Sequence, residues 1–135
     1  MIHARALPPA ALLALSGGLA ACAEPGGAAP AGAAVPEYLG IETRLLDSDL
    51  VQFHLALRGG GRAEIDDYAR CAAAQYALIR GMGFARHIRT TASAEAGTWR
   101  GDAVYTISAA VPPGERKIDA EVVTADCAAR GIPMV

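Results

Sequence analysis

Hydrophobic and polar residues alternate along residues 50–58. The side chains fall into two sets, Val51, Phe53, Leu55 and Leu57 on one side and Gln52, His54, Ala56 and Arg58 on the other. This period of two is typical of a strand with one buried face. Residues 41–46 precede it across Asp47-Ser48-Asp49, residue types that stabilise turns. We therefore predict that 41–46 and 50–58 pair as a hairpin.

The apolar spacing changes after Gly59-Gly60-Gly61. From residue 62 to residue 82, apolar side chains recur every three or four residues, at Ile65, Tyr68, Ala69, Ala72, Tyr76 and Ile79. This spacing is typical of an amphipathic helix. We predict one long helix over 62–82, ended by Gly81 and Gly83.

Alternation returns after the helix. In residues 84–91, Phe84 and Ile88 lie on one side, and His87 and Arg89 lie on the other. Residues 99–111 follow a polar turn at Ala96-Gly97 and are expected to pair with 84–91 as a second hairpin. After Pro112-Pro113-Gly114, the pattern predicts a strand over 118–124 and a short helical turn over 126–130.

The expected order is therefore ββαβββ followed by a short α. It favours the α+β class, with an antiparallel or mixed sheet of about five strands and the long helix across one face. Residues 38–135 are expected to form this single domain.

The amino terminus has a different composition. Met1 to Arg5 is a short positive region, and residues 6–19 are apolar but too short for a permanent membrane span. Leu19-Ala20-Ala21-Cys22 is the pattern that lipoprotein signal peptidase cuts before the cysteine. We predict that residues 1–21 are a lipoprotein signal peptide and that Cys22 is the lipidated first residue of the mature protein.

This segment has two alternative interpretations. Ala21-Cys22-Ala23 also satisfies the small-residue rule for an ordinary secretory peptide. A packed cytosolic helix would place Pro8-Pro9 and Gly17-Gly18 in a helix interior, where both residue types are unfavourable.

Residue 23 is alanine, whereas aspartate there is the common inner-membrane retention signal. The expected location is the outer membrane, facing the periplasm.

Residues 22–37 are expected to be the lipidated cysteine and a flexible tether. The segment contains Pro25, Pro30 and Pro36 among glycines and alanines, with no apolar period. A coil of this length has a typical end-to-end distance of about 20 Å. The lipid would thus hold the domain at a membrane without the domain touching it.

The chain has three cysteines. Lipidation of Cys22 leaves Cys71 and Cys127, and two remaining thiols in an oxidising compartment commonly pair. We predict a disulfide between Cys71 and Cys127 that joins the long helix to the segment after the last strand. The alternative is two separately buried thiols that act as small apolar residues.

Charge excludes one class of partner. Without residues 1–21 the chain has 11 basic and 14 acidic side chains, a formal charge of −3. Nucleic-acid binding needs clustered positive charge, so no nucleic-acid partner is expected.

Three candidate sites were considered. Arg58-Gly59-Gly60-Gly61-Arg62 could hold an anion at a helix start, but Glu64, Asp66 and Asp67 already complement the helix dipole there. His54, His87, Asp119 and Glu121 lack the short-range spacing of metal ligands. Cys71 as a nucleophile with a histidine would sit mid-helix, where nothing depresses its pKa. We expect no metal, no cofactor and no enzymatic activity.

One resemblance appears around the helix. Val51-x-Phe53, the glycine run, Asp67-Tyr68-Ala69 and Gly83-Phe84 resemble a group of small bacterial envelope lipoproteins of unassigned function. The likeness covers about residues 50–90 and the lipobox. Cys71 and Gln75 replace the charged helix face usual in that group. The resemblance implies the fold, and it carries over no catalytic residue.

Two binding functions remain. The first is a non-enzymatic envelope lipoprotein that binds a protein partner through the polar sheet face or an open sheet edge. That face is expected to carry Gln52, His54, His87 and Arg89, with Thr106 and Ser108. The alternative is a binder of small molecules or cell-wall fragments in a cleft between helix and sheet, lined by Trp99 and Tyr105.

Overall fold

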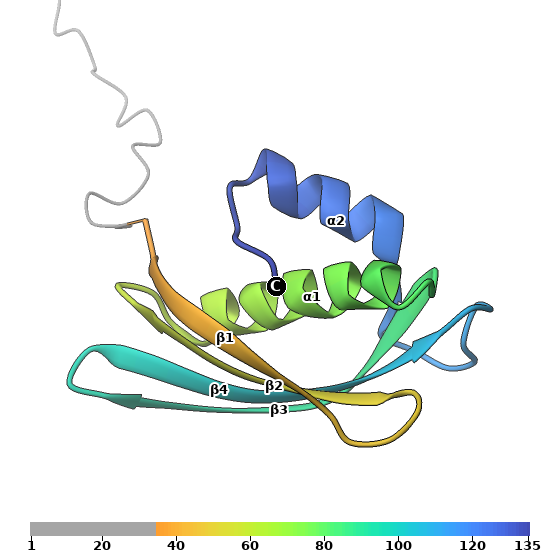
Figure 1. Ribbon diagram of the computed structural model, residues 1–135. Helices are drawn as coiled ribbons and strands as arrows, with labels where there is room; N and C mark the ends of the chain where they lie inside the picture. Colours follow the sequence, from red (N-terminus) through yellow and green to blue (C-terminus); the bar gives the residue numbers. More distant parts are fainter. Residues whose placement is uncertain (1–34) are drawn as a thin grey trace, which may run out of the picture. The chain divides into compact units, whose positions relative to one another are not determined.

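The computed structural model describes residues 35–135 (Figure 1). The predicted signal peptide (1–21), the lipidation site Cys22 and most of the predicted tether lie outside the described residues. None of the described helices combines the length and the apolar character that a membrane span requires.

The described residues form an α+β domain, as the sequence predicts. In chain order the elements are β1 (Glu37–Leu45), β2 (Leu50–Arg58), α1 (Arg62–Ile79), β3 (Phe84–Glu95), β4 (Thr98–Ser108), β5 (Lys117–Asp119) and α2 (Ala120–Ala129). The five strands form one antiparallel sheet in the order β1-β2-β4-β3-β5.

Three layers are stacked in this domain. α1 crosses one face of the sheet, and α2 packs on the side of α1 that faces away from the sheet (Figure 1). No described element covers the other face of the sheet. We call that face the open face, and the face under α1 the helix face.

Both predicted hairpins are confirmed. β1 pairs with β2 across Leu46 to Asp49, and β3 pairs with β4 across Ala96 and Gly97. Ala96 and Gly97 both have positive φ, 51° and 79°. Two consecutive positive φ angles match the strand twist of a tight hairpin, so this turn aligns two long strands.

The alanine content of α1 follows from its position between two layers. Ala72, Ala73 and Ala74 are all fully buried, although they point in three different directions around the helix. A helix that touches neighbours on opposite sides can approach both only where its side chains are small. The thin, alanine-rich core is therefore what lets α1 pack against the sheet and α2 together.

Gly101 in β4 marks the closest approach between α1 and the sheet. A Cβ atom at this position would lie 2.7 Å from Cγ2 of Ile65 and 3.0 Å from Cδ1 of Leu55. Both of those side chains are buried in the core. The missing side chain of Gly101 thus provides the space in which Ile65 packs.

The structure contains the predicted disulfide between Cys71 in α1 and Cys127 in α2. Their Cα atoms are 5.9 Å apart, and both side chains are almost fully buried. The bond ties the outer layer to the central helix across a sequence separation of 56 residues.

The predicted strand over 118–124 is wrong beyond its first two residues. β5 ends at Asp119, which caps α2: its Oδ1 accepts hydrogen bonds from the backbone N–H groups of Glu121 and Val122, both at 3.1 Å. Val122, Val123 and Thr124 are β-branched residues, which favour strands, but they lie in this helix. An aspartate N-cap and the burial of Val123 and Cys127 against α1 outweigh the weak strand propensity.

The predicted sidedness of residues 84–89 is also wrong. Ala85 is the fully buried residue here, whereas Phe84 lies on the open face. A β-bulge at Ile88 shifts the register between His87 and Arg89, and this puts His87 on the helix face and Arg89 on the open face. A bulge adds one residue to a strand, so it breaks the alternation on which the prediction depended.

Loss of the disulfide should destabilise the domain. The chain-entropy model gives about 4 kcal/mol for a loop of this length, so the double variant Cys71→Ser, Cys127→Ser should unfold at a much lower urea concentration. Cys22→Ser is the matched control and should leave the midpoint unchanged. Equal midpoints for the double variant and the wild type would show that the bond contributes nothing.

Replacement of Gly101 by alanine should overpack the helix face. We expect Gly101→Ala to lower the free energy of unfolding by about 1–3 kcal/mol. Gly83→Ala is the control, because its Cβ would meet nothing nearer than the carbonyl oxygen of Ala109 at 4.0 Å. Chemical denaturation measures both, and an equal effect of the two substitutions would contradict the close packing.

Candidate functional site

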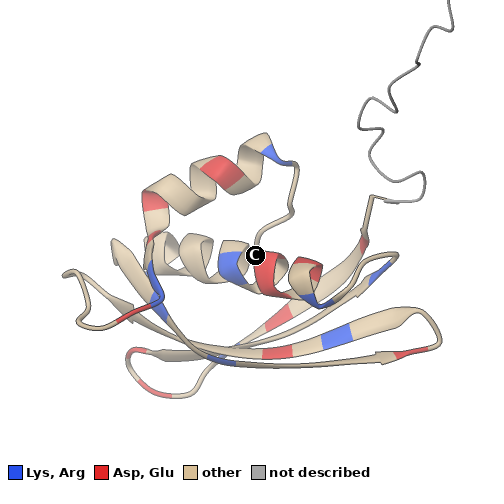
Figure 2. Cartoon of the chain, turned by 180° about the vertical axis from the view of Figure 1, so that it is seen from behind, with Lys and Arg blue, Asp and Glu red and all other residues tan. Residues whose placement is uncertain are grey.

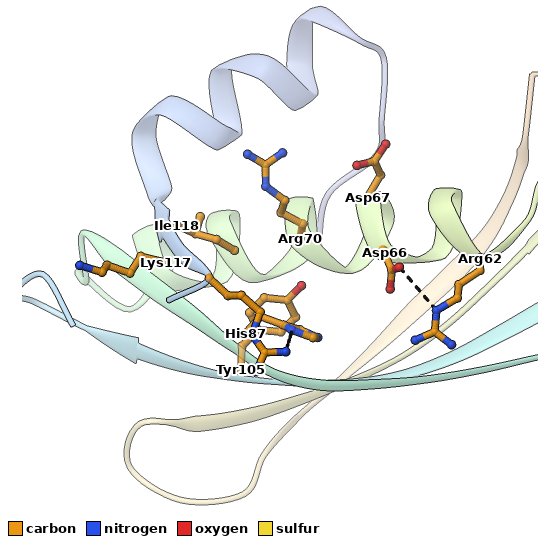
Figure 3. A pocket seen from close by; sticks show the side chains of 9 residues that line it. Arg62, Asp66, Asp67, Arg70, His87, Tyr105, Lys117 and Ile118 are labelled. Carbon is orange, nitrogen blue, oxygen red and sulfur yellow. Dashed lines mark hydrogen bonds and ion pairs between the residues drawn. The ribbon is translucent and has the colours of Figure 1, made fainter. Parts of the chain in front are cut away.

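A pocket of about 340 Å³ lies between the first half of α1 and strands β3 to β5 (Figure 3). The charged residues of α1 are confined to that half of the helix, as Figure 2 shows. Four elements and the β4–β5 loop line the pocket, with Arg62, Asp66, Asp67, Arg70, His87, Tyr105, Arg116, Lys117 and Ile118. We call this the α1 pocket.

Both acidic residues of the α1 pocket have cationic partners. The Asp66 carboxylate lies 3.7 Å from the Arg62 guanidinium one turn earlier, and Asp67 forms an ion pair with Arg130 beyond α2. Arg70 lies 4.0 Å from Asp126 of α2. The negative charges of the pocket wall are thus already balanced from within the domain.

His87 is neutral in this arrangement. Arg116 Nη1 lies 3.3 Å from His87 Nδ1, and a guanidinium can only donate, so Nδ1 must accept. The proton is then on Nε2, which donates to Thr90 Oγ1 at 2.7 Å. Burial, together with the Arg116 charge, lowers the pKa of His87.

Arg116 is held by two contacts with His87. Besides the side-chain contact, the Arg116 carbonyl oxygen accepts a hydrogen bond of 3.2 Å from the His87 backbone N–H. Arg116 has φ of 58°, a left-handed conformation uncommon for residues other than glycine. The β4–β5 loop thus brings this guanidinium to the edge of the pocket, where Arg116 is exposed.

Tyr105 forms the floor of the α1 pocket. Its side chain is only 3% exposed, and its ring packs edge to face against His87 with centroids 5.1 Å apart. The hydroxyl points toward α1 in Figure 3. Burial raises the pKa of Tyr105, and the Asp66 charge adds to this shift, so the phenol is a neutral hydrogen-bond donor.

The open face holds all the residues predicted there except His87. Gln52 Nε2 donates to both oxygens of the Asp102 carboxylate, at 2.9 and 3.0 Å, and Arg89 approaches the same carboxylate at 3.7 Å. His54 lies opposite Asp102 in the register. His87 is absent from this group, because the bulge at Ile88 turns it to the helix face and into the α1 pocket.

The other candidate sites find no support as ligand sites. The Gly61 backbone N–H donates to Glu64 Oε2 at 2.7 Å, so a side-chain carboxylate already occupies the start of α1. Cys71 has no free thiol. Within residues 35–135, no three His, Cys, Asp or Glu side chains are grouped to hold a metal ion.

Sequence reasoning named Tyr105 as a cleft residue but missed the rest of the α1 pocket. Trp99, predicted beside it, does not line the pocket. One signal was present: Arg62, Asp66 and Arg70 are spaced by four residues and so share one side of the helix. His87 and Arg116 reach the pocket because of the bulge at Ile88 and the path of the β4–β5 loop, and no pattern of residues in the sequence predicts either feature.

The neutral His87 should make stability depend on pH. A lowered pKa in the folded state means that the unfolded chain binds the proton more readily. Stability is thus full above the unfolded pKa of about 6.5 and falls as the pH drops below it. His87→Gln should reduce the loss of melting temperature between pH 7.5 and 5.5. His54→Gln is the control, and an identical pH profile for His87→Gln and the wild type would contradict this assignment.

Comparison with known proteins supports a bacterial family. The chain matches the family model described as the YNQ4 C-terminal domain over residues 38–131. It is 38% identical over 85 residues to a protein of Paracoccus denitrificans described as an uncharacterized 26.9 kDa protein in the nqo8 5' region. That alignment covers 62% of this chain and 33% of the relative, so the chain spans about a third of the relative's length. No solved structure matches. The matched residues run from the second residue of β1 to just beyond α2, and the chain belongs to the YNQ4 C-terminal domain family.

Proposed function

We propose that this chain is a non-enzymatic, lipid-anchored envelope protein that docks a partner protein on its open sheet face. The observation that carries the proposal is the network of Gln52, Asp102 and Arg89 on that face. These side chains come from three adjacent strands, β2, β4 and β3. They form a connected polar surface that no described element covers.

The network fixes side chains more than it stabilises the fold. Arg89 is about half exposed, and exposed ion pairs contribute only about 0–1 kcal/mol. Val104 lies between Gln52 and Arg89 in the register and is only 5% exposed, although it is on the open face. The flanking polar side chains therefore lie in a defined arrangement over it. Ordered side chains lose less entropy when a partner binds.

The sheet edges are less suited to docking. β1 is the long edge strand, and it carries a bulge between Tyr38 and Gly40 together with the charged residues Glu42 and Arg44. Bulges and charges are features with which proteins block edge pairing. The opposite edge, β5, has only three residues. The open face is thus the better surface for a partner.

The envelope location is the second part of the proposal. It rests on Leu19-Ala20-Ala21-Cys22 at the end of an apolar segment, with alanine at position 23. Lipid at Cys22 would place the domain at the periplasmic face of the outer membrane, through the proline-rich segment that follows. Acyl chains supply the membrane affinity in such proteins, so the domain itself needs no basic patch.

Lipidation is tested in cells that express the full chain. A palmitate analogue should label the wild type and should not label Cys22→Ser. The paired variant Cys71→Ser, Cys127→Ser is the control and should keep the label, because its cysteines lie in the folded domain. Equal labelling of the wild type and Cys22→Ser would disprove the anchor.

Docking is tested with a photo-crosslinking residue in living cells. Placed at Thr91, which lies on the open face opposite Asp102, it should give one discrete protein adduct. Placed at the exposed Ala125 on α2, it should give none.

The partner is then identified and purified, and its binding is measured directly. We expect Arg89→Ala to weaken binding about tenfold, while Arg80→Ala, at the end of α1, leaves it unchanged. Equal affinity of Arg89→Ala and the wild type would rule out the open face.

A further inference from the structure

The α1 pocket contains a cation that nothing in the described domain neutralises. Arg62, Arg70 and Arg130 each have a carboxylate partner, whereas Arg116 forms no ion pair with a described residue and its side chain hydrogen-bonds to the neutral His87. Lys117, the next residue, adds positive charge at the rim, with its ammonium directed outward in Figure 3. The loop side of the pocket therefore attracts negative charge.

Arg116 is also held in a costly conformation. A left-handed φ on a residue other than glycine is unfavourable and persists only where other contacts impose it. In this conformation Arg116 makes two contacts with His87. Because Nδ1 takes only one guanidinium N–H, the others remain available to a ligand.

The Tyr105 hydroxyl is the second independent feature. Tyr105 is 3% exposed and lies at the floor of the pocket, and its hydroxyl points toward α1 in Figure 3. A phenol hydroxyl can donate one hydrogen bond. A ligand oxygen in the pocket would satisfy this donor.

The remaining walls suit a small organic body. Ile118 and the Tyr105 ring supply apolar surface, and 340 Å³ is at the lower end of small-molecule pockets. A guanidinium fork matches the planar oxygens of a carboxylate or the oxygens of a phosphate. Asp66 and Asp67, the two carboxylates in the lining, are each already paired with an arginine.

From these features we infer that the α1 pocket binds a small organic anion. The Arg116 guanidinium holds its carboxylate or phosphate group, the Tyr105 hydroxyl donates to an oxygen of the ligand, and the apolar part rests on Ile118. This site is on the opposite side of the sheet from the proposed docking surface. The pocket and the open face can therefore be tested separately.

The test is an NMR titration of the isotope-labelled full chain with three probes: butyrate, inorganic phosphate and propylammonium. Butyrate, phosphate or both should shift the backbone signals of His87, Arg116 and Ile118, and propylammonium should not. Tighter binding of butyrate indicates a carboxylate ligand, and tighter binding of phosphate indicates a phosphorylated one. Either result supports the site.

Variants assign the roles within the pocket. Arg116→Gln should weaken anion binding at least about tenfold, since a charged hydrogen-bond donor is lost. Arg116→Lys should restore part of that loss. Tyr105→Phe keeps the ring and removes only the hydroxyl, so binding should weaken about fivefold with no loss of stability. Arg100→Gln, on the open face, is the matched control and should bind as the wild type does.

Three results would overturn the inference. The first is the absence of shifts with both anions at about 50 mM, which is well above the millimolar affinities typical of weak sites. The others are propylammonium binding at least as tightly as the anions, and wild-type affinity in Arg116→Gln. Equal weakening by Arg100→Gln and Arg116→Gln would also overturn it, because it would show a general charge effect.

Discussion

α1 packs closely between the sheet and α2, and this packing determines how the other elements are arranged. The helix can touch both layers because its middle is built of alanine and because Gly101 leaves room for Ile65. A disulfide then fastens α2 to the outer side of α1. Bulky side chains in this region would separate the layers, and the buried area that stabilises so small a domain would be lost.

The same constraint determines where the two candidate surfaces lie. Small buried residues occupy the second half of α1, so its charged residues are confined to the first half, where the α1 pocket forms. Both helices pack on one side of the sheet, which leaves the other side free for the Gln52–Asp102–Arg89 network. The pocket and the open face are thus separate surfaces of one domain, with separate chemistries.

Much of this fold could be predicted from the sequence because the strongest patterns lie where packing is most regular. The alternation in β2 and the helical spacing of α1 gave the correct elements, and the count of cysteines gave the disulfide. Prediction failed where a single local feature overrode a pattern. The bulge at Ile88 places His87 on the helix face instead of the open face. The Asp119 cap starts α2 at residues whose β-branched side chains favour a strand. Predicting the α1 pocket requires the strand order and the path of the β4–β5 loop. The spacing of apolar residues within one element gives neither.

The sheet, α1 and α2 should unfold as one cooperative unit. Native-state hydrogen exchange measures this, because amides that open only by global unfolding share one free energy. We expect the same free energy of exchange for amides of Ala72 to Ala74 in α1, Val123 to Cys127 in α2 and Phe53 to Leu55 in β2. Reduction of the disulfide should lower all three together. Fast exchange of α2 alone after reduction, with α1 and β2 still fully protected, would contradict it.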